Sequence, residues 1–393
     1  MSPSSNIPRQ SFVVATPGRS VCDDNARALD HHGALRFLAL GTRRGVSGIP
    51  SERTRLNPKI GFASFAASRF LSTSPAESFR FRLHPWFDRW VLKQLEPGNH
   101  LLSSYGYANE CFKWVRAHGG RTFLDAGNSH PENFWEILTE ENRRWGIGTP
   151  PLARHHFERS KAMMADVDFV LSPSQFVSRS FLERGFRPDQ ILTNIYPIDL
   201  KCFSPASVPR EPGRPLTIIC TGSLSLRKGT PYLLEAFRLV LKSHPAARLR
   251  LTRIVHDNVL PILAKHGDLP IDWAPALPHP ELAKRLQESD IYVLPSLEEG
   301  LARTGLEALA CGLPAVVTPN TGLEAFIKPG LNGEIVPIRD PAAIAEAILK
   351  WADQILGDKQ RAPIPFDSSL CSFERFEREF IGQLEKLNLP NSN

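Results

Sequence analysis

The chain has few cysteines, no cysteine cluster and no long hydrophobic run, and each absence excludes a class of protein. Zinc sites and disulfide frameworks need closely spaced cysteines, whereas the six here are scattered over positions 22, 111, 202, 220, 311 and 371. No segment approaches the roughly 18 apolar residues of a membrane-spanning helix. The apolar run from Phe12 to Ala15 is too short for a signal-peptide core, so we expect a cytoplasmic protein.

Two ligand-binding motifs are also missing. No G-x-G-x-x-G follows the first predicted strand of either half, which argues against a dinucleotide oxidoreductase. The C-terminal half has no Asp-x-Asp motif to chelate magnesium, so we expect metal-independent chemistry. The twelve histidines include two adjacent pairs, at 31–32 and 155–156, but adjacent side chains on a helix diverge by about 100°. No metal site is therefore predicted.

Positive charge is concentrated in one region of the chain. Of the 393 residues, 42% are hydrophobic and 22% charged, with a net charge of +6. Between positions 36 and 93 only Glu52, Glu77 and Asp88 oppose the basic residues Arg36, Arg43, Arg44, Arg53, Arg55, Lys59, Arg69, Arg80, Arg82, Arg89 and Lys93. Such an excess indicates an anionic partner.

Aromatic residues interleave with these basic ones, at Phe62, Phe65, Phe70, Phe79, Phe81, Trp86, Phe87 and Trp90. They are either core residues beside solvated arginines, or a helical surface over 60–95 that lies on an anionic membrane. On the second interpretation the protein is peripheral on the inner face of the membrane. An RNA-binding face is a third alternative, but no nucleic-acid motif accompanies it, so we expect no nucleic-acid partner.

Apolar segments alternate with helical patterns through both halves, which predicts parallel α/β sheets. Strands are predicted at 11–17, 34–41, 100–105, 121–126 and 167–174, and again at 214–222, 248–255, 290–296 and 313–319. A proline-rich stretch over 203–215 separates the halves. We therefore predict an N-terminal domain over 1–208, with a mobile loop at 42–60, a second domain over 209–365, and a helix within 366–393 that packs back on the first domain.

The first motif with chemical content is TGSLSLRKG, residues 221–229. A strand ends at Cys220, Gly222 follows, and Arg227 and Lys228 stand just before a predicted helix. Glycine lets the backbone approach an anion closely, and two adjacent cations neutralise a diphosphate. A solvated basic turn is the plain alternative.

The second motif is PSLEEGLARTGLEALACGLPAVVTP, residues 295–319, in which seven residues separate Glu299 from Glu307. A helix is predicted from about Ala302, so its free N–H groups and positive dipole end face a ligand at the strand tip. Glu307 lies a little over one turn into that helix, where its carboxylate can accept hydrogen bonds from ribose hydroxyls.

Together the two motifs resemble the donor site of glycosyltransferase family 4, whose members have the GT-B fold. The resemblance is strong over 215–350, where 320–337 is similar to the family's next segment, and weaker over 155–186. Residues 124–146 resemble the sugar-binding turn of one bacterial branch. The resemblance implies two Rossmann-like domains facing a cleft, with no cofactor besides a nucleotide-diphosphate sugar donor, UDP- or GDP-linked. It also implies retention at the anomeric carbon, and we expect same-face attack assisted by the leaving phosphate.

The same resemblance implies residue roles. Arg227 and Lys228 would hold the donor diphosphate and stabilise it as leaving group, and Glu307 would bind the ribose. Glu299 would contact the donor sugar near the reacting carbon, and His130, in GNSH at a strand tip, would reach it from the N-terminal domain unless its role is structural. Other predicted donor contacts are Gly222, the backbone of Gly300, Leu301 and Ala302, the base-binding Ala276 and Leu277, and Arg303, whose charge would replace one missing at Ser223.

The predicted function is therefore transfer of a sugar, of hexosyltransferase type, to a glycan or lipid-linked acceptor in polysaccharide or glycolipid biosynthesis. Two alternatives stay open. A nucleotide-sugar epimerase of the same fold would form product from the donor alone. A non-catalytic nucleotide-sugar-binding scaffold would bind the donor and be insensitive to loss of Glu299 or His130.

Overall fold

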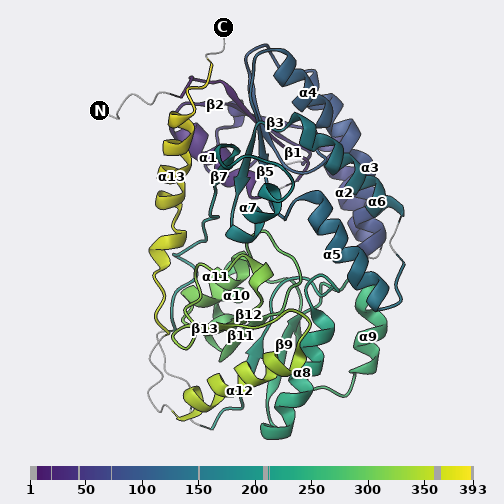
Figure 1. Cartoon of the computed structure of the whole chain (residues 1–393), viewed down its shortest axis with the longest axis vertical. Helices are drawn as coiled ribbons and strands as arrows, with labels where there is room; N and C mark the ends of the chain where they lie inside the picture. Colours follow the sequence, from purple (N-terminus) through teal and green to yellow (C-terminus); the bar gives the residue numbers. More distant parts are fainter. Residues whose placement is uncertain are drawn as a thin grey trace.

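The computed structural model describes residues 7–18, 20–42, 45–71, 73–148, 151–206, 211, 213–357 and 364–390, which form two parallel sheets flanked by helices (Figure 1). The strands of the first sheet are β1 (Phe12–Thr16), β2 (Leu35–Leu40), β3 (Thr54–Leu56), β4 (His100–Ser103), β5 (Thr122–Asp125), β6 (Phe169–Ser172) and β7 (Ile191–Thr193). Their order is β3-β2-β1-β4-β5-β6-β7. The helices of this domain are α1 (Cys22–His31), α2 (Pro58–Phe70), α3 (Thr73–Leu92), α4 (Asn109–Ala117), α5 (Pro131–Arg144), α6 (Pro151–Met163) and α7 (Gln175–Leu182).

The second sheet has the same arrangement. Its strands are β8 (Thr217–Ile219), β9 (Arg248–Thr252), β10 (Ile271–Ala274), β11 (Ile291–Leu294), β12 (Ala315–Val317) and β13 (Gly333–Ile335), in the order β10-β9-β8-β11-β12-β13. Its helices are α8 (Thr230–Ser243), α9 (Leu260–Lys265), α10 (His279–Gln287), α11 (Arg303–Ala310) and α12 (Pro341–Gly357). In each sheet the strand order reverses beside the first strand, and ligands of such sheets bind at the carboxyl ends next to that point.

Helices cover both faces of each sheet, which explains why the strands are hydrophobic throughout. In β1, Val13 and Ala15 face a cluster that includes Phe87 of α3. Phe12 and Val14 face the opposite cluster, with Leu29 of α1. Side chains alternate across a strand, so a strand buried on both faces has no polar positions to reveal its period.

The C-terminal helix α13 (Phe373–Lys386) returns to the N-terminal domain and lies beside α1 (Figure 1). Phe380 is buried in the same cluster as Leu29. The Gln383 amide donates to Thr193 O and accepts from Thr193 N, both at 2.8 Å, and so satisfies the backbone of β7 at the sheet edge.

The predicted loop over 42–60 is wrong for much of its length. Thr54 to Leu56 form β3, paired in parallel with Leu38 to Leu40 of β2, and α2 already begins at Pro58. Arg53 is tied to Asp30 of α1 at 2.8 Å. A three-residue edge strand follows a Gly- and Pro-rich segment here, and it is too short to show an apolar pattern. Residues 43 and 44 of the predicted loop lie outside the described residues.

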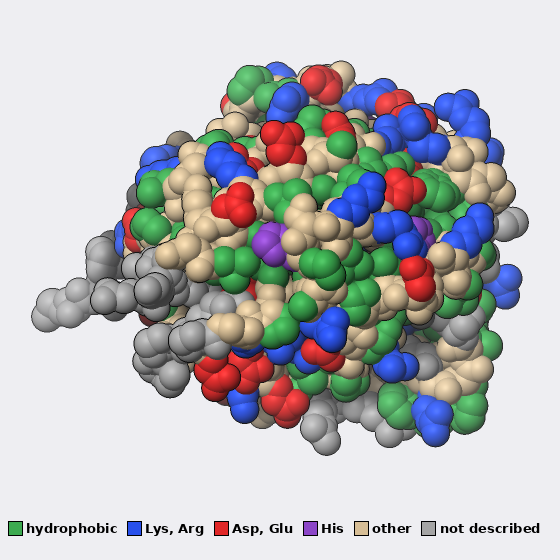
Figure 2. Space-filling model, turned by 90° about the horizontal axis from the view of Figure 1, so that it is seen from below, with side chains coloured by type: hydrophobic (Ala, Val, Ile, Leu, Met, Phe, Trp, Pro, Cys, Tyr) green, Lys and Arg blue, Asp and Glu red, His purple; other side chains and the backbone are tan. Residues whose placement is uncertain are grey.

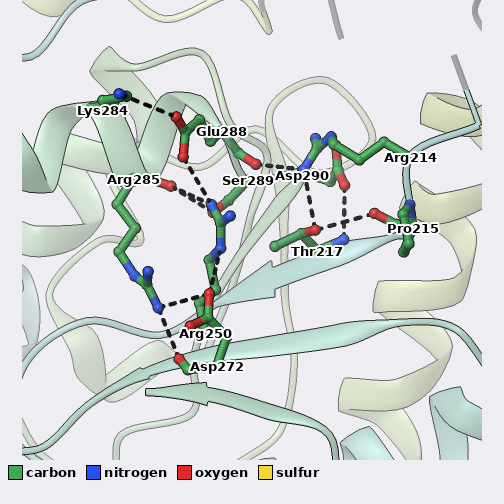
Figure 3. A network of polar contacts seen from close by, with 10 residues as sticks. All are labelled: Arg214, Pro215, Thr217, Arg250, Asp272, Lys284, Arg285, Glu288, Ser289 and Asp290. Atoms are coloured by element: carbon green, nitrogen blue, oxygen red, sulfur yellow. Dashed lines mark hydrogen bonds and ion pairs between the residues drawn. The ribbon is translucent and has the colours of Figure 1, made fainter. Parts of the chain in front are cut away.

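A polar network closes the amino-terminal end of the second sheet (Figure 3). Asp290, fully buried before β11, accepts from Thr217 N at 2.8 Å and pairs with Arg214 at 2.7 Å. Arg250 of β9 pairs with Asp272 of β10 at 3.2 Å. These contacts lie at the opposite end of the strands from the expected ligand site and fix the strand starts in register.

None of the helices in the described part of the chain is both long and apolar enough to cross a membrane. The face of the second domain, seen from below in Figure 2, carries acidic and basic side chains interspersed with hydrophobic ones.

Candidate functional site: the turns after β8 and β11

The turn between β8 and α8 is held in a conformation that requires glycine. Gly222 has φ = +100° and Gly229 has φ = +67°, in the left-handed region that disfavours other residues. A Cβ on Gly229 would lie 2.0 Å from Pro295 O, so this turn packs directly on the one after β11. Leu224 N donates to Ile254 O at 2.7 Å, which fixes the middle of the turn to the segment after β9.

The two turns meet through charged side chains. Glu299 pairs with both Lys228 and Arg227, the latter at 3.1 Å, and accepts from Ser296 Oγ at 3.1 Å. Burial raises the pKa of Glu299, but the two cations more than offset it, so the pKa lies below its ordinary value. Both α8 and α11 begin without a side-chain cap. The two cations immediately precede the uncapped N-terminus of α8, and this combination suits an anion.

Glu298, which the sequence analysis missed, joins the two domains. Its carboxylate is fully buried, accepts from Ser129 N at 2.8 Å and Asn128 Nδ2 at 2.9 Å, and lies 3.5 Å from Arg227. Burial raises the pKa of Glu298, and Arg227 partly counters this. The side chains of consecutive residues point in different directions, and that of Glu298 points to the turn after β5. The two adjacent glutamates in the sequence could therefore have indicated a second contact.

The backbone of the acidic motif approaches the N-terminal domain closely. A Cβ on Gly300 would lie 2.3 Å from Gly127 O, and Ser174 Oγ donates to Gly300 O at 2.7 Å. Phe176 N, at the start of α7, donates to Glu324 at 3.0 Å. Leu301 and Ala302 are buried behind this contact. The predicted backbone contacts of Gly300 to Ala302 with a donor therefore lie where the two domains touch.

Farther from this contact, Glu141 of α5 forms a second tie between the domains. It is buried and accepts from Tyr232 OH and Arg339 Nε, both at 2.7 Å, and from Trp145 Nε1 at 2.8 Å. Tyr232 and Arg339 belong to the second domain, so the C-terminal end of α5 is held against it.

Glu307 lies on α11 at 7% exposure, and its Oε2 has no hydrogen-bond partner among the described residues. Burial raises the pKa of Glu307 to about 7, despite the lowering effect of Arg303. A buried carboxylate oxygen without a partner is costly, and a ligand hydroxyl would satisfy it.

The remaining predicted residues lie elsewhere. His130 caps α5, accepting from Glu132 N at 3.3 Å, and packs edge-on against Phe181 and Phe186. It is 4% exposed, and burial lowers its pKa to about 4. Arg303 pairs with Asp24 of α1 at 3.4 Å. Ala276 is exposed and Leu277 half-buried after β10. The catalytic role of His130 and the base contacts stay predictions.

A cavity of about 590 Å³ opens between the domains beside Arg227. The second domain contributes Ser223, Ser225 and Arg227 to its wall, while α3, α5 and α6 contribute several aromatic side chains among polar and aliphatic ones. Phe81 stacks on His156 at 4.2 Å between ring centroids, and Trp135 stacks on Phe157 at 4.6 Å. His130 is not among the described residues that line it.

Histidine is a further component of this wall that sequence reasoning missed. His84 and His156 lie with ring centroids 5.4 Å apart, and neither Nδ1 has a partner among the described residues. Burial lowers the pKa of both, that of His156 to about 4, which favours the neutral form of each ring. They stand 72 positions apart in sequence, on α3 and α6, and no local pattern connects them. The described residues contain no group of three or more His, Cys, Asp and Glu side chains that could hold a metal ion.

Comparison with known proteins decides the family of the second domain. Residues 215–354 match the family of glycosyl transferases group 1. They form a group 1 domain. This segment contains both turns described above, and the resemblance predicted for it is confirmed.

Two relatives of the chain are named as glycosyltransferases. Over 215 residues the chain is 26% identical to the putative colanic acid biosynthesis glycosyltransferase WcaL of Salmonella typhimurium, covering 52% of this chain and 53% of that protein. Over 277 residues it is 24% identical to D-inositol 3-phosphate glycosyltransferase of Frankia alni, covering 60% and 67%. The matched part thus spans about half the length of WcaL.

A solved structure similar to the whole chain is sucrose-phosphate synthase of Thermosynechococcus elongatus. The TM-score is 0.68 at 19% identity, covering 96% of this chain and 99% of that one. This likeness concerns the fold, and it confirms the predicted GT-B arrangement, in which a second Rossmann-like domain faces the group 1 domain.

Proposed function

We propose that this chain is a retaining, metal-independent glycosyltransferase that moves a sugar from a nucleotide-diphosphate donor to a glycan or lipid-linked acceptor. One observation carries the proposal. Arg227 pairs with Glu299 at 3.1 Å in the candidate donor site and also lines the cavity between the domains. A donor held by the second domain and an acceptor in the cavity would therefore meet at one side chain. The relatives named above support a role in glycan assembly.

On the donor side, Arg227, Lys228 and the first N–H groups of α8 would hold the diphosphate. As the bond to the sugar breaks, negative charge grows on the leaving phosphate, and fixed cations stabilise that charge without reorganisation. Glu307 would accept hydrogen bonds from the ribose, which would give its unpartnered Oε2 a donor. Glu299 keeps both cations in place and would contact the sugar.

Retention would follow from attack on the same face of the sugar as the leaving phosphate, which would itself accept the proton of the acceptor hydroxyl. A double displacement needs a carboxylate nucleophile near the anomeric carbon. Glu299 is already engaged by two cations, and Glu298 by Ser129 and Asn128. Transfer should proceed in EDTA, and NMR of the product should show the donor's anomeric configuration. An inverted product would exclude the same-face step.

A thermal-shift screen against UDP, GDP, ADP, TDP, CMP and their sugars tests the donor site. A ligand at a hundred times its dissociation constant stabilises the protein by about 2.7 kcal/mol. One nucleotide class should stabilise the wild type and the control Lys242→Ala, which changes an exposed lysine of α8. The same class should fail to stabilise Lys228→Ala. Equal stabilisation of both variants would place the nucleotide elsewhere and contradict the proposal.

A further inference from the structure

The α2–α3 hairpin has two chemically different faces. Leu83, Phe87 and Val91 of α3 recur at helical spacing and are buried in the core of the N-terminal domain. Ile60 and Ser64 of α2, with other residues of α3, line the cavity between the domains. The inner face of the hairpin thus contacts the core and the cavity.

The outer face exposes large aromatic side chains. Phe62 is 55% exposed, Phe65 68%, Phe70 82% and Trp86 66%. Of the aromatic residues in this region, Phe87 belongs to the core and these four do not. Isolated exposed apolar residues are common on proteins, but these four are all large aromatics, and they lie on two helices that pack against each other.

Among the described side chains of α2 and α3, the exposed charges have one sign. The exposed charged residues among the described side chains of 58–93 are Lys59, Arg69, Arg82, Arg89 and Lys93. The sequence of this segment contains two acids, Glu77 and Asp88. Asp88 is buried, pairs with Arg159 at 3.3 Å and accepts from Cys111 N at 3.1 Å, so it does not reach this surface. By contrast, the face of the molecule in Figure 2 carries both acidic and basic side chains.

We propose that this outer face docks on an anionic lipid bilayer, and that the acceptor is carried by that bilayer. Aromatic side chains between cations on a helix surface fit the boundary between headgroups and acyl chains, where rings enter and cations stay with the phosphates. The helices lie on the membrane and do not span it. Because the same two helices form a wall of the cavity, docking brings the cavity beside the bilayer. The inference that the bilayer carries the acceptor rests on the proposed function, whereas the inference of docking does not.

Co-sedimentation with vesicles tests the docking without any enzymatic readout. Wild-type protein should bind vesicles of phosphatidylglycerol and phosphatidylcholine, bind pure phosphatidylcholine far more weakly, and lose binding as salt rises. Arg82→Gln with Arg89→Gln removes two charges and should weaken binding about 30-fold. Phe65→Ser with Trp86→Ser should also weaken it, with the salt dependence retained.

Matched controls change equivalent groups on the second domain. Lys242→Gln with Lys284→Gln removes two exposed charges, and Leu260→Ser removes an apolar side chain that is 52% exposed. Both should bind anionic vesicles like the wild type. The melting temperature of every variant without ligand shows whether it is folded.

Three results would overturn the docking proposal: equal binding to neutral and anionic vesicles, no binding to either, or equal losses in the control variants. Tight binding of single-stranded RNA that Arg82→Gln with Arg89→Gln abolishes, together with absence of vesicle binding, would assign the face to nucleic acid instead. The nucleotide-induced thermal shift should be the same in all these variants. Absence of a nucleotide-induced thermal shift in the wild type would refute the donor site and would not affect the vesicle result.

Discussion

Replacing Gly300 with alanine should separate the two domains while leaving the charged side chains of the donor site in place. The added Cβ would lie 2.3 Å from Gly127 O and 2.6 Å from Gly127 C. Both are backbone atoms, so no side-chain rotation relieves the overlap. Ordinary contact needs roughly 3.4 Å, and overpacking of this kind costs about 1–3 kcal/mol.

If the domains moved apart by about 1 Å to relieve this overlap, the hydrogen bonds that flank the contact would be stretched. Ser174 Oγ donates to Gly300 O at 2.7 Å, and Ser129 N donates to Glu298 at 2.8 Å. Each such bond contributes about 1 kcal/mol, and more when it reaches a carboxylate. The closed arrangement should therefore lose about 3 kcal/mol, which corresponds to a population change on the order of 100-fold.

Small-angle scattering and nucleotide binding measure the two consequences separately. Gly300→Ala should increase the radius of gyration and lower sugar transfer about 100-fold. The affinity for the nucleoside diphosphate should change little, because Lys228 and Glu307 lie in the second domain. Gly127→Ala is the matched control, because a Cβ there meets nothing within 4 Å. Unchanged scattering and transfer in Gly300→Ala, or equal effects in both variants, would refute the reasoning.

Three further predictions concern single side chains. Burial raises the pKa of Glu307 to about 7, and its ionised form would accept from the ribose, so nucleotide affinity should fall roughly tenfold per pH unit below that value. The nucleotide affinity of Glu307→Gln, measured in parallel by calorimetry, should lack this pH dependence. Superimposable profiles of affinity against pH for the two proteins would contradict the ribose contact. Asp290→Ala should cost about 3 kcal/mol in urea unfolding, because it leaves Thr217 N and Arg214 without their buried partner. Asp272→Ala, at a half-exposed pair, should cost under about 1 kcal/mol, and equal costs would argue against the network in Figure 3. His130→Asn keeps an N-cap and should preserve stability, whereas His130→Ala should lose about 1 kcal/mol; a loss of transfer in both variants without a loss of stability would instead support a catalytic role.

The fold followed from the sequence because its signals are local and repeated. Strands such as β1 and β11 are short apolar runs between helical patterns, and that alternation allows few arrangements. The exceptions are the edge strands of the two sheets, β3, β7, β10 and β13, which have three or four residues each. Their pairing depends on the neighbouring strand, and an apolar pattern cannot develop over so short a length.

The donor side of the candidate site was predictable for a similar reason. Arg227 and Lys228 come from one strand–turn–helix unit and Glu299 from another, and parallel pairing of β8 with β11 brings the two turns together. The contacts of Glu298 depend on the N-terminal domain, which its own motif does not describe. His130 shows the converse, because its place at a strand tip does not determine where the ring points. The Phe181 and Phe186 rings that pack on it come from α7 and the turn after it.

The central claim is that the protein transfers a sugar, and the most direct test is to measure the transfer of a labelled sugar from its nucleotide donor. The nucleotide sugar selected by thermal shift, labelled in its sugar, is incubated in EDTA with the protein and a lipid extract. Equal amounts of free nucleoside diphosphate and labelled product, with neither formed by Lys228→Ala, are predicted. Conversion of the donor into an epimer without any acceptor, or binding with no turnover, would contradict the account.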